Sequence, residues 1–459
     1  MDHVRFQKPD ILGDLTRKEG SPSHAVIEAS AGTGKTFTLK HLVVDLLLED
    51  GASLDEILIV TFTRRATGEL KIEVREILRR VVAVAEGRDE PPDIGSKLAW
   101  EIGPAELRAA KQALSDFDSA QIYTIHAFCQ RLLTDHAFFN EQLFDGELVD
   151  EEWLHEECFY EVLRRHYARR EEFKPALEMW LELGNDVEDL RSPLTTAIGG
   201  EDIVRPVVEH EEFDQLVALD ADEMEDVQKE RFKAGLVARF AEEFQREVER
   251  CKARDGYFTY DDMLDVVHEH LGCGQHSSSF DDTFLRAVRD EFTYALIDEF
   301  QDTDRKQWEI FRQIFVEEDA GTVYLIGDPK QSIYGFRGAN IDVYFQARKE
   351  VDKLCGDDAL QNLPLNYRST EDVIKAYNVL FEDDGDTPFF SGKNAETYVE
   401  AVECGLTERA ATAMDTGEPI TPVEILEFVP LDEDLRSGPA RAAMRERIAV
   451  QIDEILRGE

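Results

Sequence analysis

Basic residues are scarce in this sequence. The chain of 459 residues has 51 lysines and arginines against 98 aspartates and glutamates, which gives a formal net charge of −47. The acidic residues are spread over every segment, which suits a well-hydrated surface in a cytoplasm of high salt, where repulsion between like charges is screened. The alternative is a protein that avoids nucleic acid or binds basic partners. We favour the first interpretation, and since salt also weakens phosphate contacts, any binding of nucleic acid should depend more on base stacking.

Cysteines and long apolar runs are also few. The six cysteines have no paired spacing, so reduced thiols are favoured over a disulfide framework. The N-terminal residues MDHVRFQKPD contain no apolar signal segment, and no stretch approaches the roughly 18 apolar residues that a membrane span requires. We therefore expect a cytoplasmic protein that does not contact a membrane. Its length exceeds that of one compact core and predicts two or three domains.

A glycine-containing segment, ASAGTGKT, follows an apolar run at 25–27 and precedes an apolar-periodic helix from Lys35 through Leu48. This is the pattern of a phosphate-binding loop between a strand and a helix. Because glycine has no Cβ, Gly32 and Gly34 let successive backbone N–H groups curl around phosphate oxygens. The alternative is an ordinary glycine turn, and alanine stands at the first position, where the usual pattern has glycine. The residues predicted to bind ATP here are Ala29, Ser30, Ala31, Gly32, Thr33, Gly34, Lys35 and Thr36.

Hydrolysis of ATP also needs charged groups around the phosphates. Lys35 would reach the β- and γ-phosphates, and the hydroxyl of Thr36 would ligate Mg²⁺. Far along the chain, in LIDEFQDTD, a short apolar run at 294–297 is typical of a buried strand, and it ends where α/β sheets bind ligands. Asp298 would hold Mg²⁺ there. Glu299 would orient and deprotonate the attacking water, which requires a carboxylate beside the metal that is not itself a ligand.

Strand-like runs alternate with helical periodicity along the chain. The predicted strands include Ile57 to Thr61, Gln121 to Ile125, Tyr294 to Ile297 and Val323 to Ile326, and the clearest helix is Arg65 to Val84. This alternation is the signature of a parallel sheet, so the expected fold class is α/β.

The most specific segment is LIGDPKQSIYGFRGAN, residues 325–340, where a strand ends and a loop mixes an amide, aromatic rings, an arginine and glycines. Gln331 would sense a γ-phosphate while Tyr334 and Phe336 offer rings on which bases stack. That combination would couple the state of the nucleotide to the grip on a strand of nucleic acid. From spacing alone, the alternative is a polar loop with two core aromatics.

Seven segments occur in the order found in UvrD/Rep-type superfamily 1 DNA helicases. They are ASAGTGKT, VTFTRRATGEL, YTIHAFCQRLL, FTYDDML, LIDEFQDTD, LIGDPKQSIYGFRG and LNYRS. EASAGTGKTFTL and TIHAFCQRLL most resemble the RecB branch, the exodeoxyribonuclease V beta subunits, and alanine at the first loop position is ordinary in this family. The resemblance covers roughly the first four-fifths of the chain, and it implies the RecA-like parallel sheet of P-loop NTPases.

The resemblance and the change of pattern along the chain predict a domain organisation. We expect a first motor domain in two parts, 1–125 and 259–361, a helical insertion at 126–258, and the start of a second motor domain at 362–459. The long, charged, helix-forming stretches of 126–258 carry few strand signals, which is why we assign them to an insertion. In the last part we expect a strand at 423–429 and a helix at 440–457.

The resemblance also implies roles for individual residues. It implies DNA contacts by Thr61, Phe62, Thr63, Thr124 and His126, and a stacking platform of Tyr334, Phe336 and Arg337. Tyr367 would stack on adenine, and Arg368 would act as an arginine finger on the γ-phosphate from the second motor domain. The implied catalytic set is Lys35, Asp298, Glu299, Gln331 and Arg368. From the residues alone, the alternatives are core aromatics, a satisfied histidine and a surface ion pair.

Some features of the family are not found in the sequence. The family usually reads adenine with a glutamine upstream of the phosphate loop, and Gln7 is the only glutamine there, in a context that does not match clearly. Nothing after Arg368 resembles the later helicase motifs or a RecB-like nuclease domain. We therefore expect the N-terminal portion of a larger enzyme, inactive or weak by itself, because translocation needs two domains that close and open with ATP.

Two functional hypotheses follow. The first is an ATP- and Mg²⁺-dependent helicase or translocase that moves 3′ to 5′ on single-stranded DNA in double-strand-break repair and recombination, with RecC/RecD-like partner subunits. The second is a non-catalytic module that binds ATP and single-stranded DNA and completes its site with a partner. An open reading frame that continues into the missing motifs would favour the first, and a native stop codon after Glu459 the second.

Two further clusters suggest metals only weakly. His268, His270, Cys273 and His276 lie within nine residues, but their order fits no reliable zinc spacing, so an ordinary loop is favoured. The acidic loop from Glu382 to Asp386 resembles a calcium loop only in its charge.

Overall fold

The computed structural model of the chain describes residues 4–15, 24–136, 146–199, 204–273, 282–335, 339–356, 359–381 and 403–405. The expected strand at 423–429, the expected helix at 440–457 and the acidic loop at 382–386 lie outside these residues. Phe336, Arg337 and His276 lie outside them as well.

A six-stranded sheet forms the centre of the main body, in the order β10–β2–β9–β8–β3–β5, and every neighbouring pair is parallel. The strands are β2 (Ala25–Ala29), β3 (Ile57–Thr61), β5 (Ile122–Thr124), β8 (Tyr294–Ile297), β9 (Thr322–Gly327) and β10 (Leu360–Leu363). This sheet confirms the predicted α/β class. The strands predicted at 57–61 and 294–297 have the same limits in the structure.

Each central strand presents alternate residues to two different hydrophobic cores. In β3, Ile57 and Ile59 belong to one core, whereas Leu58 and Val60 belong to the other. A parallel sheet that is covered on both faces has near-continuous apolar strands, because neither side of the strand meets water. The unbroken run ILIVT therefore follows from the position of β3 inside the body.

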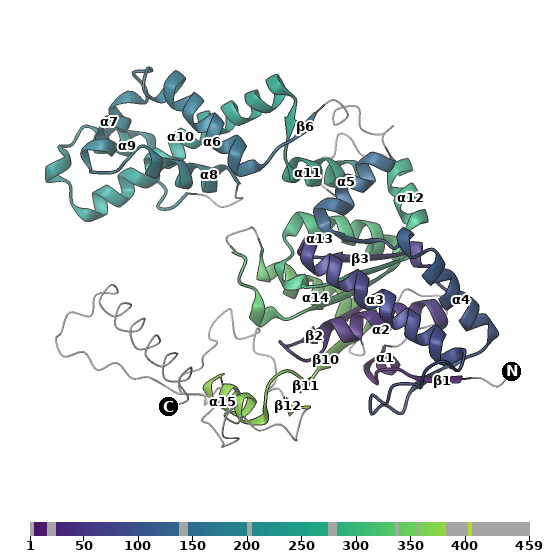
Figure 1. Cartoon of the computed structure of the whole chain (residues 1–459). Helices are drawn as coiled ribbons and strands as arrows, with labels where there is room; N and C mark the ends of the chain where they lie inside the picture. The colour runs from purple at the N-terminus through teal and green to yellow at the C-terminus, as the bar shows by residue number, and fades with distance from the viewer. Residues whose placement is uncertain are drawn as a thin grey trace, which may run out of the picture.

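Helices cover both faces of the sheet (Figure 1). The first core contains α2 (Lys35–Leu48), α3 (Arg64–Ala85) and α4 (Pro104–Ser115), together with α1 (Ile11–Asp14) and the antiparallel pair β1 (Val4–Gln7) and β4 (Ala99–Ile102). The second core contains α5 (Ile125–Asp135), α11 (Tyr260–His270), α12 (Asp282–Glu291), α13 (Arg305–Phe311) and α14 (Ile341–Cys355).

A separate helical lobe lies between α5 and α11 in the sequence and beside the sheet in space (Figure 1). It consists of α6 (Glu151–Val162), α7 (Lys174–Glu182), α8 (Arg191–Gly199), α9 (His210–Val217) and α10 (Asp226–Asp255). Its own core includes Tyr167 and Phe240, whose rings stack with centroids 4.1 Å apart. The short parallel pair β6 (Glu147–Leu148) and β7 (Tyr257–Phe258) joins the two ends of the lobe.

The packing places two boundaries differently from the sequence estimate. The expected insertion began at 126, but Phe128 and Leu132 of α5 are buried in the second core of the sheet, so the core of the lobe begins after α5. The expected second motor domain began at 362, but β10 is paired with β2 through Leu363. The domain to which an apolar residue belongs depends on the element that buries it. The charge pattern along the sequence does not indicate which element that is.

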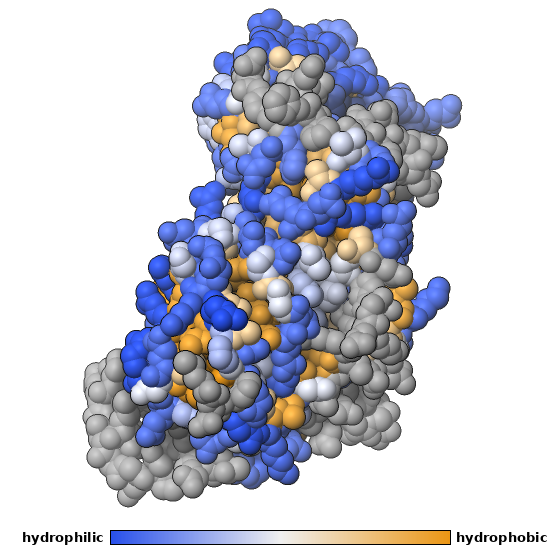
Figure 2. Space-filling model, turned by 90° about the vertical axis from the view of Figure 1, so that its right-hand side faces the viewer, coloured by the Kyte–Doolittle hydropathy of each residue, from blue (hydrophilic) through white to orange (hydrophobic). Residues whose placement is uncertain are grey.

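The surface is largely polar, as the composition requires. Hydrophilic residues dominate the face seen in Figure 2, with apolar residues gathered between them. The six cysteines are free in the described residues. In the part of the chain that the structure describes, no helix has the length and apolar character needed to cross a membrane.

His41 is a titratable group buried inside α2, with 2% of its surface exposed. Its ring centroid lies 4.1 Å from that of Phe37 and 6.2 Å from that of Trp100, and its Nδ1 lies 2.6 Å from the carbonyl oxygen of Phe37. Burial lowers the pKa of His41 from 6.5 to about 4. The folded protein therefore keeps this imidazole neutral across the range in which an exposed histidine gains a proton.

This histidine should make the fold sensitive to mild acid. Between about pH 6.5 and 4 the unfolded chain binds a proton at His41 that the folded chain does not, so its contribution to stability is complete above 6.5 and is lost as the pH falls. Relative to His41→Phe, the wild-type free energy of unfolding should fall by about 2 kcal/mol between pH 7.5 and 4.5, as measured by urea denaturation. The same change at exposed His210 of α9 should have no such effect. A difference between wild type and His41→Phe that does not vary with pH would contradict this explanation.

Candidate active site

The turn after β2 has the geometry of a phosphate-binding loop. Gly32 and Gly34 have φ values of +82° and +98°, in the left-handed region that favours glycine. The N–H and the Oγ1 of Thr33 both donate to the carbonyl oxygen of Ser30, at 3.2 and 2.8 Å, and these bonds hold the turn. Because α2 begins at Lys35, the turn aims its N–H groups and the lysine toward the same space.

Asp298 and Glu299 follow β8 and lie beside this turn. The Nζ of Lys35 lies 2.5 Å from the Oε2 of Glu299, although the two residues are 264 positions apart. The N–H of Asp298 donates to the carbonyl oxygen of Val60 at 2.8 Å, which fixes the acidic pair at the end of the strand. The two segments expected to form one site therefore meet in the structure.

Two acidic groups of this site, Asp298 and Asp302, have raised pKa values. Burial, followed by the negative charge of Glu299, raises the pKa of Asp298 to about 6 and that of Asp302 to about 6. Glu299 has a φ of +53°, which is uncommon for a residue other than glycine and costs backbone energy. Asp302 is buried and Asp298 and Glu299 are partly buried, and carboxylates gathered in this way form a donor set that suits a divalent cation. Thr36, the other expected Mg²⁺ ligand, is exposed on the first turn of α2.

Gln301 connects the acidic segment to the loop after β9, a role that the sequence analysis did not identify. It is 2% exposed, its Nε2 donates to the Oε2 of Glu299 at 2.9 Å, and its Oε1 accepts from the N–H of Asp328 at 2.9 Å. A Cβ at Gly327 would lie 2.6 Å from that Oε1, so this close approach requires glycine. In the sequence, Gln301 is one polar residue of the LIDEFQDTD segment, and nothing there indicates its partners.

The loop after β9 also reaches the phosphate loop. Gln331, expected to sense the γ-phosphate, donates from its Nε2 to the Oδ2 of Asp328 at 2.7 Å. Lys330, which the sequence analysis did not single out, donates from its Nζ to the Oγ of Ser30 at 3.0 Å. A second lysine thus stands at the phosphate loop beside Lys35.

The LNYRS segment lies against the same turn. The N–H of Tyr367 donates to the carbonyl oxygen of Gly32 at 2.8 Å, and a Cβ at Gly32 would lie 2.6 Å from the Cβ of Arg368. Tyr367 is 53% exposed and Arg368 is exposed, so both side chains can meet a ligand. In the loop itself Ala29 is buried, whereas Ala31 is exposed.

The residues expected to contact DNA follow the neighbouring strands at the same edge of the sheet. Thr61 and Thr124 are register partners at the ends of β3 and β5. Thr61 is buried, and its Oγ1 lies 2.6 Å from that of Thr67. The hydroxyls of Thr63 and Thr124 cap α3 and α5, respectively. Each of these hydroxyls therefore already has a hydrogen-bond partner within the protein.

Two aromatic pairs stand at this edge. The rings of Phe62 and Tyr334 stack with centroids 5.1 Å apart and an interplanar angle of 27°, and they come from the loops after β3 and β9. The ring of His126 meets the edge of Tyr260 at 5.3 Å, and burial lowers the pKa of His126. Phe62 and Tyr334, which were predicted from separate segments to contact DNA, thus lie side by side.

Other residues singled out in the sequence have structural partners. Gln7 lies in β1, and its Oε1 accepts from the N–H of Ile94 at 2.7 Å. The Nε2 of His268 lies 2.7 Å from the Oε2 of Glu309, and the Sγ of Cys273 donates to the carbonyl oxygen of Glu309 at 3.5 Å. The Nδ1 of His270 lies 2.8 Å from the carbonyl oxygen of Val266. These contacts agree with ordinary structural roles.

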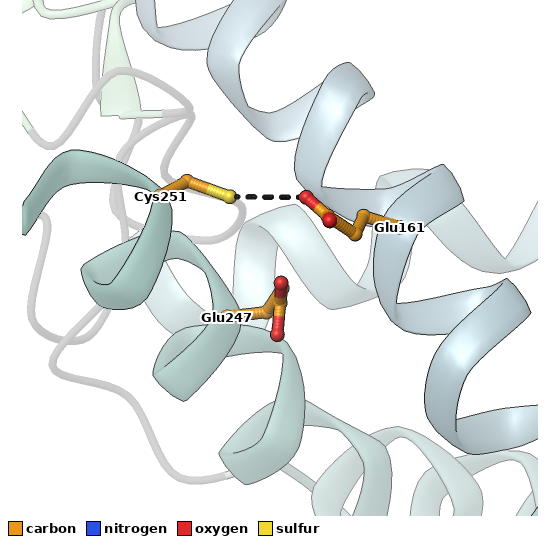
Figure 3. Close-up of side chains that lie close together, drawn as sticks. All are labelled: Glu161, Glu247 and Cys251. Atoms are coloured by element: carbon orange, nitrogen blue, oxygen red, sulfur yellow. Dashed lines mark hydrogen bonds between the residues drawn. The ribbon is translucent and has the colours of Figure 1, made fainter. Parts of the chain in front are cut away.

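Glu161, Glu247 and Cys251 lie together between α6 and α10 in the helical lobe (Figure 3). The Sγ of Cys251 donates to the Oε2 of Glu161 at 3.6 Å. Arginines already pair with both carboxylates: Arg254 lies 3.3 Å from Glu161, and Arg250 contacts Glu247. Positive charge at these oxygens opposes a cation, so the group is best described as an ion-pair network that joins two helices.

Loss of Gln301 should weaken the fold around the acidic segment. Gln301→Ala should lower the free energy of unfolding by about 1 to 3 kcal/mol, because it leaves the buried N–H of Asp328 without its acceptor. Urea denaturation without nucleotide measures this change. Gln130→Ala, an exposed position on α5, should change stability by less than about 0.5 kcal/mol. Equal stability of the two variants would remove Gln301 from the support of the site.

Comparison with known proteins agrees with this geometry. A family model for the UvrD/REP helicase N-terminal domain matches residues 16–352. The RecB subunit of the RecBCD enzyme of Escherichia coli (strain K12) is 29% identical over an alignment 464 residues long, gaps included. This alignment covers 80% of this chain and 38% of that protein. The RecB subunit of Mycobacterium tuberculosis (strain CDC 1551 / Oshkosh) is 33% identical over 383 residues, which cover 82% of this chain and 31% of that protein. The chain thus spans less than half the length of these relatives, and it belongs to the UvrD/Rep helicase family, in its RecB-like branch.

Proposed function

We propose that this chain is the ATP-binding motor part of a DNA helicase or translocase that moves 3′ to 5′ on single-stranded DNA, in double-strand-break repair and recombination. The observation that carries the proposal is the 2.5 Å contact between the Nζ of Lys35 and the Oε2 of Glu299, which joins the phosphate loop to the acidic end of β8. Membership in the helicase family and the parallel sheet support the same function.

The residues of the site fit ATP with Mg²⁺. The glycine turn offers N–H groups and a lysine to the phosphates, and the positive φ values of Gly32 and Gly34 give the turn its curvature. Asp298 and the hydroxyl of Thr36 would hold the metal ion. When bound, Mg²⁺ neutralises charge on the phosphates and on the buried acids.

The ion pair of Lys35 and Glu299 gives these residues two arrangements. In the structure, the ammonium and the carboxylate form an ion pair. With ATP present, the ammonium of Lys35 would turn to the β- and γ-phosphates, and the carboxylate of Glu299 would become free to take a proton from the attacking water. The Nε2 of Gln301 would continue to orient that carboxylate by its hydrogen bond.

Tyr367 and Arg368, which lie against the phosphate loop, would complete the nucleotide site. The exposed ring of Tyr367 would stack on adenine, and Arg368 would approach the γ-phosphate as charge develops there. Gln331 and Lys330 stand on the loop after β9, which also carries Tyr334. This loop would thereby relate the nucleotide to the DNA contacts.

Single-stranded DNA would bind at the stacked pair of Phe62 and Tyr334, with Thr61, Thr63, Thr124 and His126 nearby. A net charge of −47 disfavours a grip based on phosphates, so aromatic stacking should supply most of the affinity. Because the relatives are named as subunits of the RecBCD enzyme, we also propose RecC/RecD-like subunits as partners of the longer protein.

Two substitutions should separate ATP binding from hydrolysis. Lys35→Ala should weaken binding of a fluorescent ATP analogue to this chain and abolish DNA-stimulated hydrolysis by the full-length protein, because the phosphates lose their cation. Glu299→Gln should keep binding but lower hydrolysis by at least about 100-fold, since the proton acceptor is gone. The exposed changes Lys111→Ala in α4 and Glu101→Gln in β4 serve as controls.

Hydrolysis that persists in either active-site variant would overturn the assigned roles. ATP and DNA binding by the wild type without any hydrolysis, in the presence of partner subunits, would instead favour the non-catalytic module.

Loss of either stacking ring should weaken DNA binding without affecting ATP binding. Phe62→Ala or Tyr334→Ala should lower the affinity for a dye-labelled oligothymidine by about 5- to 100-fold, as measured by fluorescence anisotropy. Tyr377→Ala, a 50% exposed tyrosine on α15 (Glu371–Phe381), is the matched control. Unchanged affinity in both ring variants would exclude this pair as the DNA platform.

A further inference from the structure

Two successive carbonyl groups of the phosphate loop are held by one segment from elsewhere in the chain. The Nδ2 of Asn366 donates to the carbonyl oxygen of Ala31 at 2.7 Å, and the N–H of Tyr367 donates to that of Gly32 at 2.8 Å. Asn366 ends β11 (Leu365–Asn366), which is paired with β12 (Glu403–Cys404). One side-chain bond and one backbone bond therefore attach this segment to the phosphate loop.

The side chain of Asn366 is 7% exposed and has a second set of contacts. Its Oδ1 accepts from the N–H of Arg368 at 2.8 Å and from the N–H of Ser369 at 2.9 Å. These bonds fix the turn that carries Tyr367 and Arg368. One amide group thus shapes the turn and attaches it to the phosphate loop.

Glycine in the phosphate loop makes this docking possible. A Cβ at Gly32 would lie 2.6 Å from the Cβ of Arg368, 3.0 Å from the Nδ2 of Asn366 and 3.1 Å from its Oδ1. Any side chain there would push the segment away. Glycine at position 32 therefore allows the close approach of Asn366 and Arg368 as well as the left-handed backbone of the turn.

We propose that Asn366 is a positioning residue that sets Tyr367 and Arg368 against the phosphate loop, so that the two side chains meet the base and the γ-phosphate of the same nucleotide. The inference rests on the proposed function, since it concerns how that ATP site is assembled. Only asparagine or glutamine carries both an amide donor and a carbonyl acceptor, and only asparagine has a chain short enough for a turn of this kind.

Aspartate at this position separates the two tasks. In Asn366→Asp the remaining acceptor can still bind the N–H groups of Arg368 and Ser369, so the turn is kept. The donor to Ala31 is lost, and a carboxylate oxygen faces a carbonyl oxygen instead. The turn should therefore move away from the phosphate loop without unfolding.

The test is a double-mutant cycle on this chain, read by binding of a fluorescent ATP analogue. Asn366→Asp should weaken binding about 10-fold in the wild-type background, but less than 2-fold in a Tyr367→Ala/Arg368→Ala background, because its effect passes through those side chains. Asn362→Asp, an exposed position in β10, is the matched control and should bind as wild type. Full-length protein should show the same pattern as a higher KM for ATP and a lower kcat.

Two results would overturn the inference: wild-type affinity in Asn366→Asp, or a 10-fold loss that persists in the double background. If Asn366→Asp does not fold, Asn366→Ser is measured in its place, because its hydroxyl can still accept from the turn but is too short to reach Ala31. Lys35→Ala distinguishes failure of the proposed function from failure of this inference. Unchanged ATP binding in Lys35→Ala would reject the ATP site itself. Weakened ATP binding in Lys35→Ala together with wild-type ATP binding in Asn366→Asp would reject only the positioning role.

Discussion

The parallel sheet that ends β2 and β8 at one edge is the constraint on which the ion pair between Lys35 and Glu299, and with it the rest of the site, depends. The lysine opens α2 after a glycine turn, and the glutamate follows β8, so the two can meet only if β2 and β8 end at the same edge of one sheet. Strand β9 lies between them, and its polar end supplies the loop that borders both. Every helix packed on the two faces of the sheet helps to keep these strand ends in register.

In the proposed function, the same edge would couple the nucleotide to DNA. Gln301 bonds to Glu299 on one side and to the start of the loop after β9 on the other, while Tyr334 of that loop stacks on Phe62. If Glu299 moves when ATP binds, as we propose, this movement would pass to an aromatic ring through one buried amide and one short loop. Lys330 joins this loop directly to Ser30 of the phosphate loop.

The site carries features that do not favour the folded state by themselves. Burial raises the pKa of Asp298 and of Asp302 to about 6, and Glu299 has an unfavourable backbone conformation. Such costs are common where a protein prepares a site for a charged ligand, because the ligand supplies the missing compensation. The surrounding apolar strands are covered on both faces, and their burial provides stability that offsets these costs.

The sequence by itself determined the α/β class, the limits of β3, β8 and α2, and the segments that form the phosphate loop and the acidic strand end. These features are local, since burial on both faces leaves an apolar run and a tight turn leaves glycines. Only the tertiary structure decided that α5 packs on the sheet, that Gln7 accepts from Ile94, and that Gln301, Lys330 and Asn366 form hydrogen bonds with the loops of the site. Each of these depends on hydrogen bonds or packing between residues far apart in the chain, and such contacts leave no periodic pattern in the sequence.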